Sequence, residues 1–140
     1  METMETIILK NLIQNEDYTR RVVPFLDEEY FKDRNERTVY TLIRDHIHKY
    51  NRSPNRDALI IALDDRGGMT EQSYKDTSII IKSITDTIDP VDNEWLMDQT
   101  EKFCKDKAVY NAILRSIEII DGKSKNETKN AIPNILSDAL

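Results

Sequence analysis

A stretch of about thirty residues without Pro or Gly, from Asp92 to Asp121, places the tightest constraint on the fold of this 140-residue chain. Each residue of an α-helix adds 1.5 Å, so this stretch allows a helix of roughly 45 Å. Residues at alternating spacings of three and four form a heptad stripe along it, and six of its eight members are apolar. The stripe consists of Leu96, Gln99, Phe103, Asp106, Tyr110, Ile113, Ile117 and Ile120.

The distal half of this predicted helix is apolar over most of its circumference. Nine of the thirteen residues from Ala108 to Ile120 are apolar. A single partner helix covers only a stripe, so we expect this half to be contacted from more than one direction. Gly122 is predicted to end the helix, and a polar tip at residues 123–127 follows.

After the tip, apolar residues recur at the spacing i, i+3, i+4, i+7, i+8. They are Ile132, Ile135, Leu136, Ala139 and Leu140. This spacing predicts an amphipathic helix that returns along the first arm. The sequence stops within the pattern and has no C-cap signal, so we interpret the chain as a fragment of a longer protein, or its tail as a segment that folds only against a partner.

The remaining segments also predict helices, because turn residues are few (3 Gly and 4 Pro) and apolar residues fall at helical spacing. Helices are expected over 5–14, 35–50 and the segment carrying Leu59 and Leu63 that Gly67-Gly68 stops. A shorter helical pattern through Tyr18, Val22 and Phe25 breaks at Pro24 and Asp27. Because the opening triplet Met-Glu-Thr occurs twice, it is interpreted as a duplicated start, and structure is expected from Met4.

The run from Ser78 to Ile84 suits a buried strand as well as a helix. Ile80, Ile84 and Ile88 recur every four residues and no second strand is available, so a helix is predicted, starting near Thr70–Ser73. Pro90 disfavours helix at Asp89 and marks a boundary. The sequence therefore predicts an all-α protein with a compact helical head over 1–90, followed by a long helical hairpin over 91–140.

Composition excludes several classes of function. Lys and Arg number 20 against 26 Asp and Glu, and a net charge of −6 disfavours tight binding to a phosphate backbone. The only basic cluster is Lys123, Lys125 and Lys129, which allows a weak, salt-sensitive contact with about three phosphates. A single cysteine, Cys104, indicates a reducing compartment. The chain has no apolar run of membrane length, and its acidic start is unlike a signal peptide, so we expect a soluble, intracellular protein.

No set of residues supports catalysis by this chain. Gly122-Lys123-Ser124 resembles part of a phosphate-binding loop, but the required earlier glycine is replaced by Ile117. His46 and His48 lie two apart on a predicted helix and point about 200° from each other, so they cannot share a metal ion. Adjacent acids such as Asp64-Asp65 are interpreted as a solvated face. We therefore expect no catalytic residue, cofactor or metal site in this chain.

The order and spacing of several motifs resemble the N-terminal domain of the DnaB-like replicative helicases of tailed phages, from Met4 to Leu140. The motifs are Met4-Glu5 with Leu9 and Leu12, Tyr30-Phe31 with Val39-Tyr40, and Ser53-Pro54 with Asp57, Leu59 and Leu63. Further along are Trp95-Leu96, the run Thr100 to Phe103 with Ala108, Asn111 and Ala112, and Ala131-Ile132-Pro133 with Ile135 and Leu136. One departure is Lys10-Asn11, where many bacterial members have glycines.

The resemblance implies that hairpins pair between subunits and form a collar, often a trimer of dimers, on a hexameric motor. The parent protein would unwind DNA in the 5′ to 3′ direction with ATP and Mg²⁺ bound by a motor domain absent from this sequence. Partners would be further copies of the chain, a primase and, through the motor, DNA, in the cytoplasm of a phage-infected bacterium. The residues expected to mediate self-association are Phe103, Tyr110, Ile113, Leu114, Ile117, Ile120, Ile132, Ile135 and Leu136. A free-standing helical adaptor of a phage complex is the alternative.

Overall fold

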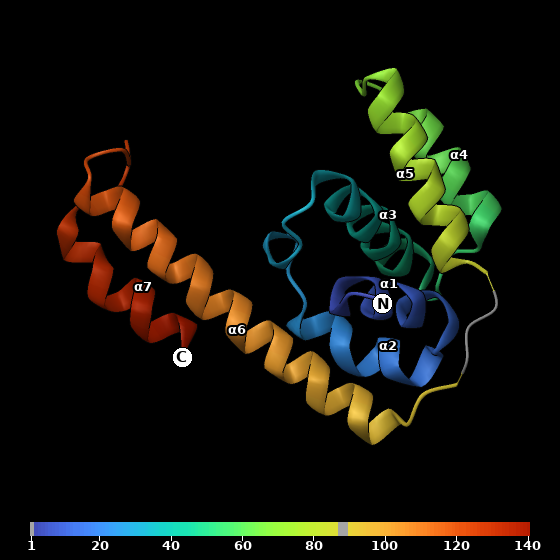
Figure 1. Ribbon diagram of the computed structural model, residues 1–140, viewed down its shortest axis with the longest axis horizontal. Helices are drawn as coiled ribbons and strands as arrows, with labels where there is room; N and C mark the ends of the chain where they lie inside the picture. The colour runs from blue at the N-terminus through green and yellow to red at the C-terminus, as the bar shows by residue number, and fades with distance from the viewer. Residues whose placement is uncertain (1, 87–89) are drawn as a thin grey trace. The chain divides into compact units, whose positions relative to one another are not determined.

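The computed structural model describes residues 2–86 and 90–140, and over these residues it contains α-helices, short 3-10 turns and no strand (Figure 1). This confirms the all-α prediction. The helices are α1 (Met4–Gln14), α2 (Glu16–Val22), α3 (Arg34–Tyr50), α4 (Arg56–Arg66), α5 (Glu71–Ile84), α6 (Asn93–Ile120) and α7 (Ile132–Ala139). The 3-10 turns are η1 (Val23–Phe25), η2 (Glu28–Tyr30) and η3 (Lys129–Ala131). Two compact units, Met1–Thr100 and Glu101–Leu140, are distinguished, and the boundary between them falls within α6.

Most helix boundaries follow from local capping. The side chains of Asn15, Asn55 and Thr70 each accept a hydrogen bond from the backbone N–H three residues later, at 3.2, 2.8 and 3.1 Å. These bonds satisfy amide donors that have no partner in the first turn of a helix. At the other end of α4, Gly67 adopts a φ of +62°, which favours glycine. The predicted start near Thr70 and the predicted stop at Gly67-Gly68 are confirmed.

The core of the first unit forms around α3, which packs against α1, α4 and α5. The ring of Phe31, just after η2, stacks on that of Tyr40 in α3, with centroids 4.9 Å apart. Each element contributes a stripe of buried apolar residues at helical spacing. Residues that are 2% exposed or less include Ile8, Leu9, Leu12, Tyr18, Val22, Phe31, Val39, Tyr40, Ile43, Leu59, Leu63, Ile81, Ile84 and Leu96.

The prediction of a helix over 78–84 is confirmed, but only Ile84 of the two described isoleucines at a spacing of four is buried. Thr77, Ile81 and Ile84 are buried in α5, whereas Ile80 is half-buried. Ile88 and Asp89, on which the spacing and the boundary were partly based, lie outside the described residues. Three consecutive isoleucines offer overlapping apolar faces, and the packing of α5 against α3 and α4 selects the one through Ile81.

The repeated opening triplet contributes to the structure one residue earlier than expected. The Thr3 side chain is the N-cap of α1 and accepts a hydrogen bond from Thr6 N at 3.2 Å. Glu2 forms an ion pair with Lys10. Helix α1 itself begins at Met4, as expected, but its cap comes from Thr3, so the first copy of the triplet also contributes to the structure.

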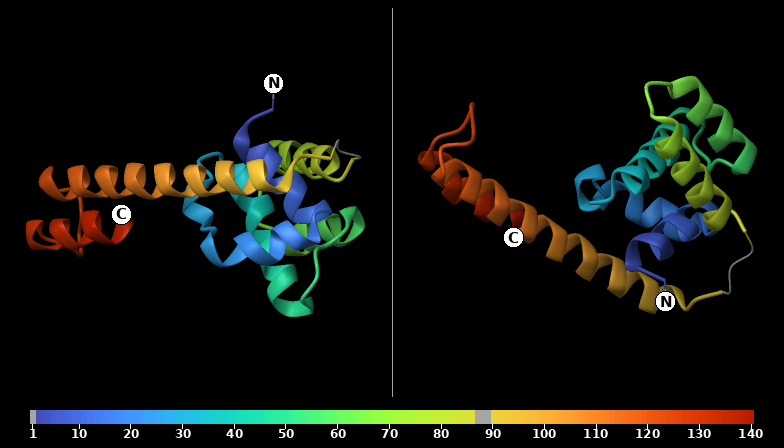
Figure 2. Two further views of the ribbon diagram at one scale, coloured as in Figure 1. Left: turned by 90° about the horizontal axis from the view of Figure 1, so that it is seen from below. Right: turned by 45° about the horizontal axis from the view of Figure 1, so that its top comes forward.

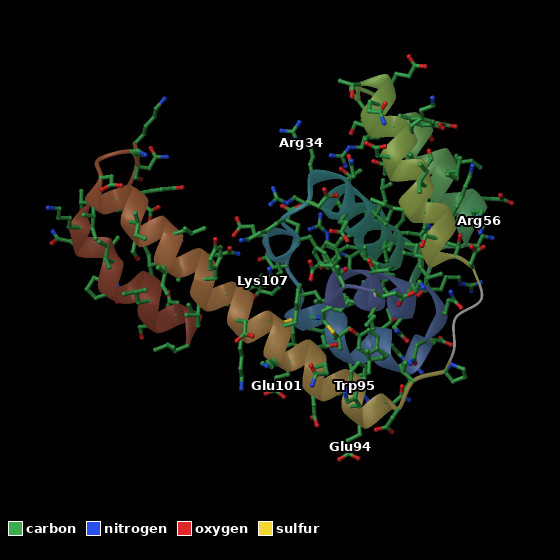
Figure 3. All side chains as sticks on the ribbon, in the orientation of Figure 1. Arg34, Arg56, Glu94, Trp95, Glu101 and Lys107 are labelled. Carbon is green, nitrogen blue, oxygen red and sulfur yellow. The ribbon has the colours of Figure 1, made fainter. Side chains whose placement is uncertain are left out.

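Polar side chains bind the end of α5 within the first unit. Arg56, labelled in Figure 3, donates to Thr85 Oγ1 at 2.7 Å, to the Lys82 carbonyl at 3.0 Å and to Asp86 Oδ1 at 2.7 Å. Gln14 Nε2 donates to the carbonyl of Asp86 at 2.6 Å. These bonds satisfy carbonyls at the C-terminal end of a helix and connect segments far apart in the sequence.

Candidate self-association surface

The long helix ends with a motif that reverses the chain. Gly122 has a φ of +74°. Its N–H donates to the Ile119 carbonyl at 3.1 Å, and the N–H of Lys123 donates to the Glu118 carbonyl at 2.9 Å. This pair of bonds is a Schellman motif, which satisfies the last carbonyls of a helix and needs a left-handed residue, usually glycine. The prediction that Gly122 ends the helix is confirmed.

Beyond the turn, the chain returns as η3 and α7, and α7 runs back beside the distal half of α6 in Figure 1 and in the left view of Figure 2. Arg115 on α6 forms a bidentate ion pair with Glu127 in the connecting segment, and one of its two bonds, Nε to Oε1, measures 2.8 Å. Pro133 lies in the first turn of α7, where its missing N–H costs nothing. The second unit is therefore a helical hairpin.

One narrow face of the distal half of α6 is buried. Ala112, Ser116 and Ile119 are 7%, 6% and 5% exposed. Their spacing of four and three places them on a single side of the helix. Because α7 is the helix that lies beside this half within the hairpin, we assign its cover to the return arm. Ser116 donates its hydroxyl to the Ala112 carbonyl at 2.8 Å, so this polar group is satisfied inside the hairpin.

The neighbouring faces of α6 carry large apolar side chains that the chain leaves exposed. Five of them have exposed fractions between 42% and 57%. We call this set the α6 stripe, and it consists of Tyr110, Ile113, Leu114, Ile117 and Ile120. An exposed contiguous apolar surface on one element is typical of a protein contact site.

The buried face of this half of α6 does not coincide with the heptad stripe seen in the sequence. The heptad positions Tyr110, Ile113 and Ile117 were expected to pack against the return arm and a neighbouring subunit; in the single chain they are about half exposed, and the buried face passes through Ala112, Ser116 and Ile119. Large aliphatic residues dominated the sequence pattern, whereas two of the three buried positions in this half of α6 carry small residues. Two small residues at a spacing of four, Ala112 and Ser116, were the signal that the pattern analysis passed over.

The other predicted association residues differ in exposure. Phe103 is buried, and Lys107 Nζ lies 5.7 Å from its ring centroid. On the return arm, Ile132 and Ile135 are half-buried and Leu136 is 37% exposed. Within the hairpin, the apolar surface open to a further molecule therefore includes the α6 stripe together with Leu136 and Leu140. The role of these residues in self-association stays a prediction.

The three lysines of the tip, Lys123, Lys125 and Lys129, are exposed. In the described part of the chain none of them forms an ion pair, and the nearby Glu127 is engaged by Arg115. The weak phosphate contact expected of these three lysines stays a prediction.

The other chemically reactive residues do not gather into a site. His46 is half-buried against Tyr50, with ring centroids 4.7 Å apart, and burial lowers its pKa, with a further contribution from Arg52. Burial raises the pKa of Cys104 to about 11, which suppresses its reactivity at neutral pH. Over residues 2–86 and 90–140 no group of three metal-ligating side chains comes together. None of the helices in these ranges combines the length and apolar character needed to cross a bilayer.

Comparison with known proteins decides the relationship. No protein-family model matches the chain. A DnaB-like replicative helicase of Enterobacteria phage T4 is 33% identical to it over an alignment of 145 residues, which covers 98% of this chain. The chain is a relative of the DnaB-like replicative helicases. It spans 30% of the length of the phage T4 helicase, which is consistent with an N-terminal domain of a DnaB-like protein. The resemblance inferred from the motifs is confirmed.

Proposed function

We propose that this chain is the N-terminal collar domain of a phage replicative helicase and that it holds subunits together through its hairpin. The observation that carries the proposal is the α6 stripe: five large apolar side chains stay about half exposed on a chain related to a DnaB-like helicase. Within the chain, the return arm covers a different face of α6. A second copy of the hairpin carries the same apolar stripe and would cover the α6 stripe on association.

The energetics favour weak association of the isolated chain. Burying the exposed half of a large apolar side chain contributes about 1 kcal/mol. Five such residues on each of two copies supply about 10 kcal/mol, against an association cost of about 4–15 kcal/mol. The two magnitudes are comparable, so we expect the isolated chain to form a weak dimer. The hexamer, as a trimer of dimers, would also draw on the motor domains of the parent protein.

The parent protein, in this proposal, unwinds DNA in the 5′ to 3′ direction in the cytoplasm of the infected bacterium. Its ATP and Mg²⁺ belong to a motor domain, and this chain contributes assembly rather than catalysis. The collar would also dock the primase at the replication fork. Support for these steps comes from the relationship to a replicative helicase.

Sedimentation velocity over a range of concentrations tests the assembly role. Ile117→Asp places a charge in the α6 stripe and is expected to weaken self-association at least tenfold, because that charge loses water on contact. Ile79→Asp is the matched control, since Ile79 is 64% exposed on α5 in the other unit. Circular dichroism checks that both variants stay helical. Equal self-association of wild type and Ile117→Asp, or strictly monomeric wild type at millimolar concentration, would contradict the proposal.

The docking role has a separate test. Isothermal titration of the chain with the primase encoded by the same phage is expected to show saturable binding. No heat of binding, with a primase that is active on its own, would remove docking from the proposal and leave the assembly role intact. A chain that neither self-associates nor binds primase would favour the free-standing adaptor.

A further inference from the structure

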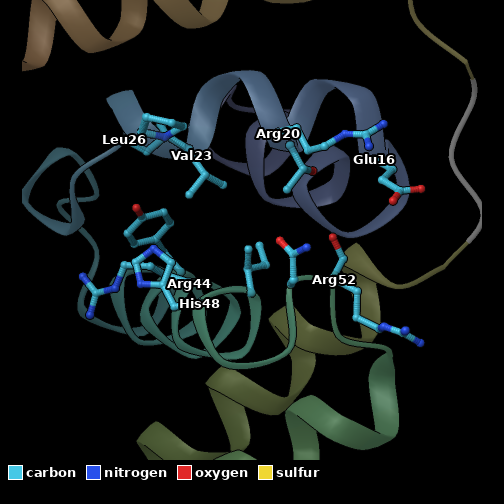
Figure 4. A pocket seen from close by; sticks show the side chains of 13 residues that line it. Glu16, Arg20, Val23, Leu26, Arg44, His48 and Arg52 are labelled. Atoms are coloured by element: carbon cyan, nitrogen blue, oxygen red, sulfur yellow. The ribbon is translucent and has the colours of Figure 1, made fainter.

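A second candidate binding surface lies in the first unit, in the cleft between α2 with η1 and the C-terminal half of α3. The cleft has a volume of about 650 Å³, within the range of ligand-binding pockets. Figure 4 shows Arg44 and His48 at one end of it, Arg20 and Glu16 at the other, and Val23 and Leu26 along one wall. Its lining therefore combines apolar walls with a charged rim.

The charge of this rim is opposite to that of the chain. Three arginines, Arg20, Arg44 and Arg52, line the cleft with a single acid, Glu16. The chain as a whole has a net charge of −6. Cations gathered on an acidic protein create a local positive potential, which attracts an anionic partner and rejects other cationic surfaces.

The three arginines of the cleft differ in whether they form ion pairs with acidic residues of the chain. Arg44 already has acidic neighbours outside the lining, Asp45 at 3.2 Å and Glu28 at 3.7 Å. Arg20 and Arg52 form no ion pair in the described part of the chain, although the sequence carries 26 acidic residues. Their guanidinium groups are therefore available for the bidentate binding of carboxylates.

The walls of the cleft favour a peptide over a nucleic acid. Val23, Leu26 and Ile47 are half-buried aliphatic residues that line it. Proteins that hold single strands stack bases on open aromatic faces. Tyr40 is 1% exposed and its ring stacks on Phe31, so among the described lining residues the small imidazole of His48 is the one open ring. Aliphatic walls with a cationic rim match an apolar side chain flanked by carboxylates.

We propose that this cleft binds an acidic peptide segment of a partner protein, with a large apolar side chain of the peptide between α2 and α3 and its carboxylates on Arg20 and Arg52. The site is separate from the α6 stripe. The proposal goes beyond the collar function and stands whether or not the hairpin self-associates.

Selection of peptides from a random library tests the proposal. Twelve-residue peptides displayed on phage are selected against the immobilised chain, and we expect enrichment of sequences that combine Asp or Glu with a large apolar residue. An enriched peptide is then synthesised and titrated by fluorescence anisotropy. Replacing its apolar residue with serine is expected to weaken binding at least fivefold. The absence of acidic enrichment would overturn the proposal.

Two double variants with the same change in net charge separate the cleft from general electrostatics. Arg20→Ala with Arg52→Ala is expected to weaken peptide binding at least tenfold. Arg21→Ala with Arg66→Ala removes two cations that do not line the cleft and is expected to change binding less than twofold. Equal loss in both double variants would show attraction by the overall charge only and would overturn the proposal.

Two further measurements identify a different occupant. A labelled oligo-dT that binds more tightly than any selected peptide, and depends on Arg20 and Arg52, would assign the cleft to single-stranded DNA. A change in sedimentation of the Arg20→Ala, Arg52→Ala variant would assign it to a second copy of the chain. Either result would overturn the peptide proposal. Ile117→Asp is expected to keep peptide binding, so failure of the collar function is distinguishable from failure of this one.

Discussion

The hydroxyl of Tyr18 in α2 lies 2.7 Å from Thr100 Oγ1 in α6, with both side chains buried. Thr100 donates its own proton to the Leu96 carbonyl at 2.7 Å. A threonine hydroxyl has one proton, so Tyr18 is the donor of the bond between the two side chains. The bond fixes the beginning of α6 to α2 within the first unit.

Loss of this bond is expected to destabilise the first unit. Tyr18→Phe removes the donor and should lower the free energy of unfolding by about 1 kcal/mol, the usual net value of a buried hydrogen bond. Urea denaturation measures the change. In a double-mutant cycle with Thr100→Val, we expect a coupling energy of about 1 kcal/mol. Strictly additive effects would show that the two hydroxyls do not interact.

The Arg56 contacts at the end of α5 predict a second loss of stability. Arg56→Ala removes three hydrogen bonds that join α4 to the end of α5, and we expect a cost of about 1 kcal/mol because the arginine is partly exposed. Arg66→Ala, at the other end of α4, removes a cation that has no ion pair within the described residues. In thermal unfolding, Arg56→Ala should have a lower midpoint temperature than the wild type, and Arg66→Ala should have the same midpoint as the wild type.

Gly122→Ala tests the turn of the hairpin. A Cβ at this position meets no atom within 4 Å, so the cost comes from the left-handed backbone alone, about 1 kcal/mol. Amide hydrogen exchange at the bonded N–H groups of residues 122 and 123 should accelerate about fivefold. Gly68→Ala, with a φ of +72° and equally open space, should leave these two amides unchanged. Unaltered exchange in Gly122→Ala would contradict this account of the turn.

Cys104 predicts a dependence on pH. Its folded pKa of about 11 leaves about one thiolate in a thousand at pH 8, so modification by a disulfide reagent should be slow and should accelerate about tenfold per pH unit up to pH 10. The folded pKa lies above the ordinary value of 9.0. Between pH 9 and 11 the folded chain holds the thiol proton more tightly than the unfolded chain does. The free energy of unfolding is therefore highest below pH 9 and falls as the pH rises towards 11. Rapid modification of the folded chain at pH 8 would show that the thiol is not buried.

Helix positions were predictable because their signals are local. Asn55, Thr70 and Gly122 begin or end helices through bonds to residues at most a few positions away, and such signals are present in any sequence window. Thr3 carried the same signal and was set aside only because its triplet is repeated. The relationship to the helicases was also accessible, because it depends on the order of motifs along the chain.

The faces of the helices were less predictable. In α5 the buried position is Ile81 rather than Ile80, and in α6 it is Ser116 rather than Ile117. Runs of similar aliphatic residues allow several faces, and the neighbouring helices decide between them. The cleft arginines gave no periodic signal, because Arg20 and Arg52 come from separate segments that only the fold brings together.

The small side chains of Ala112 and Ser116 influence how far apart the two arms of the hairpin lie. Both side chains are small, so the space between the two arms is filled mainly from the return arm, where Ile132 and Ile135 are half-buried. Larger side chains at these two positions would push the two arms apart and change the shape of the face of α6 that carries the α6 stripe. The surface that a second molecule would contact thus depends on two buried residues that are not themselves part of it.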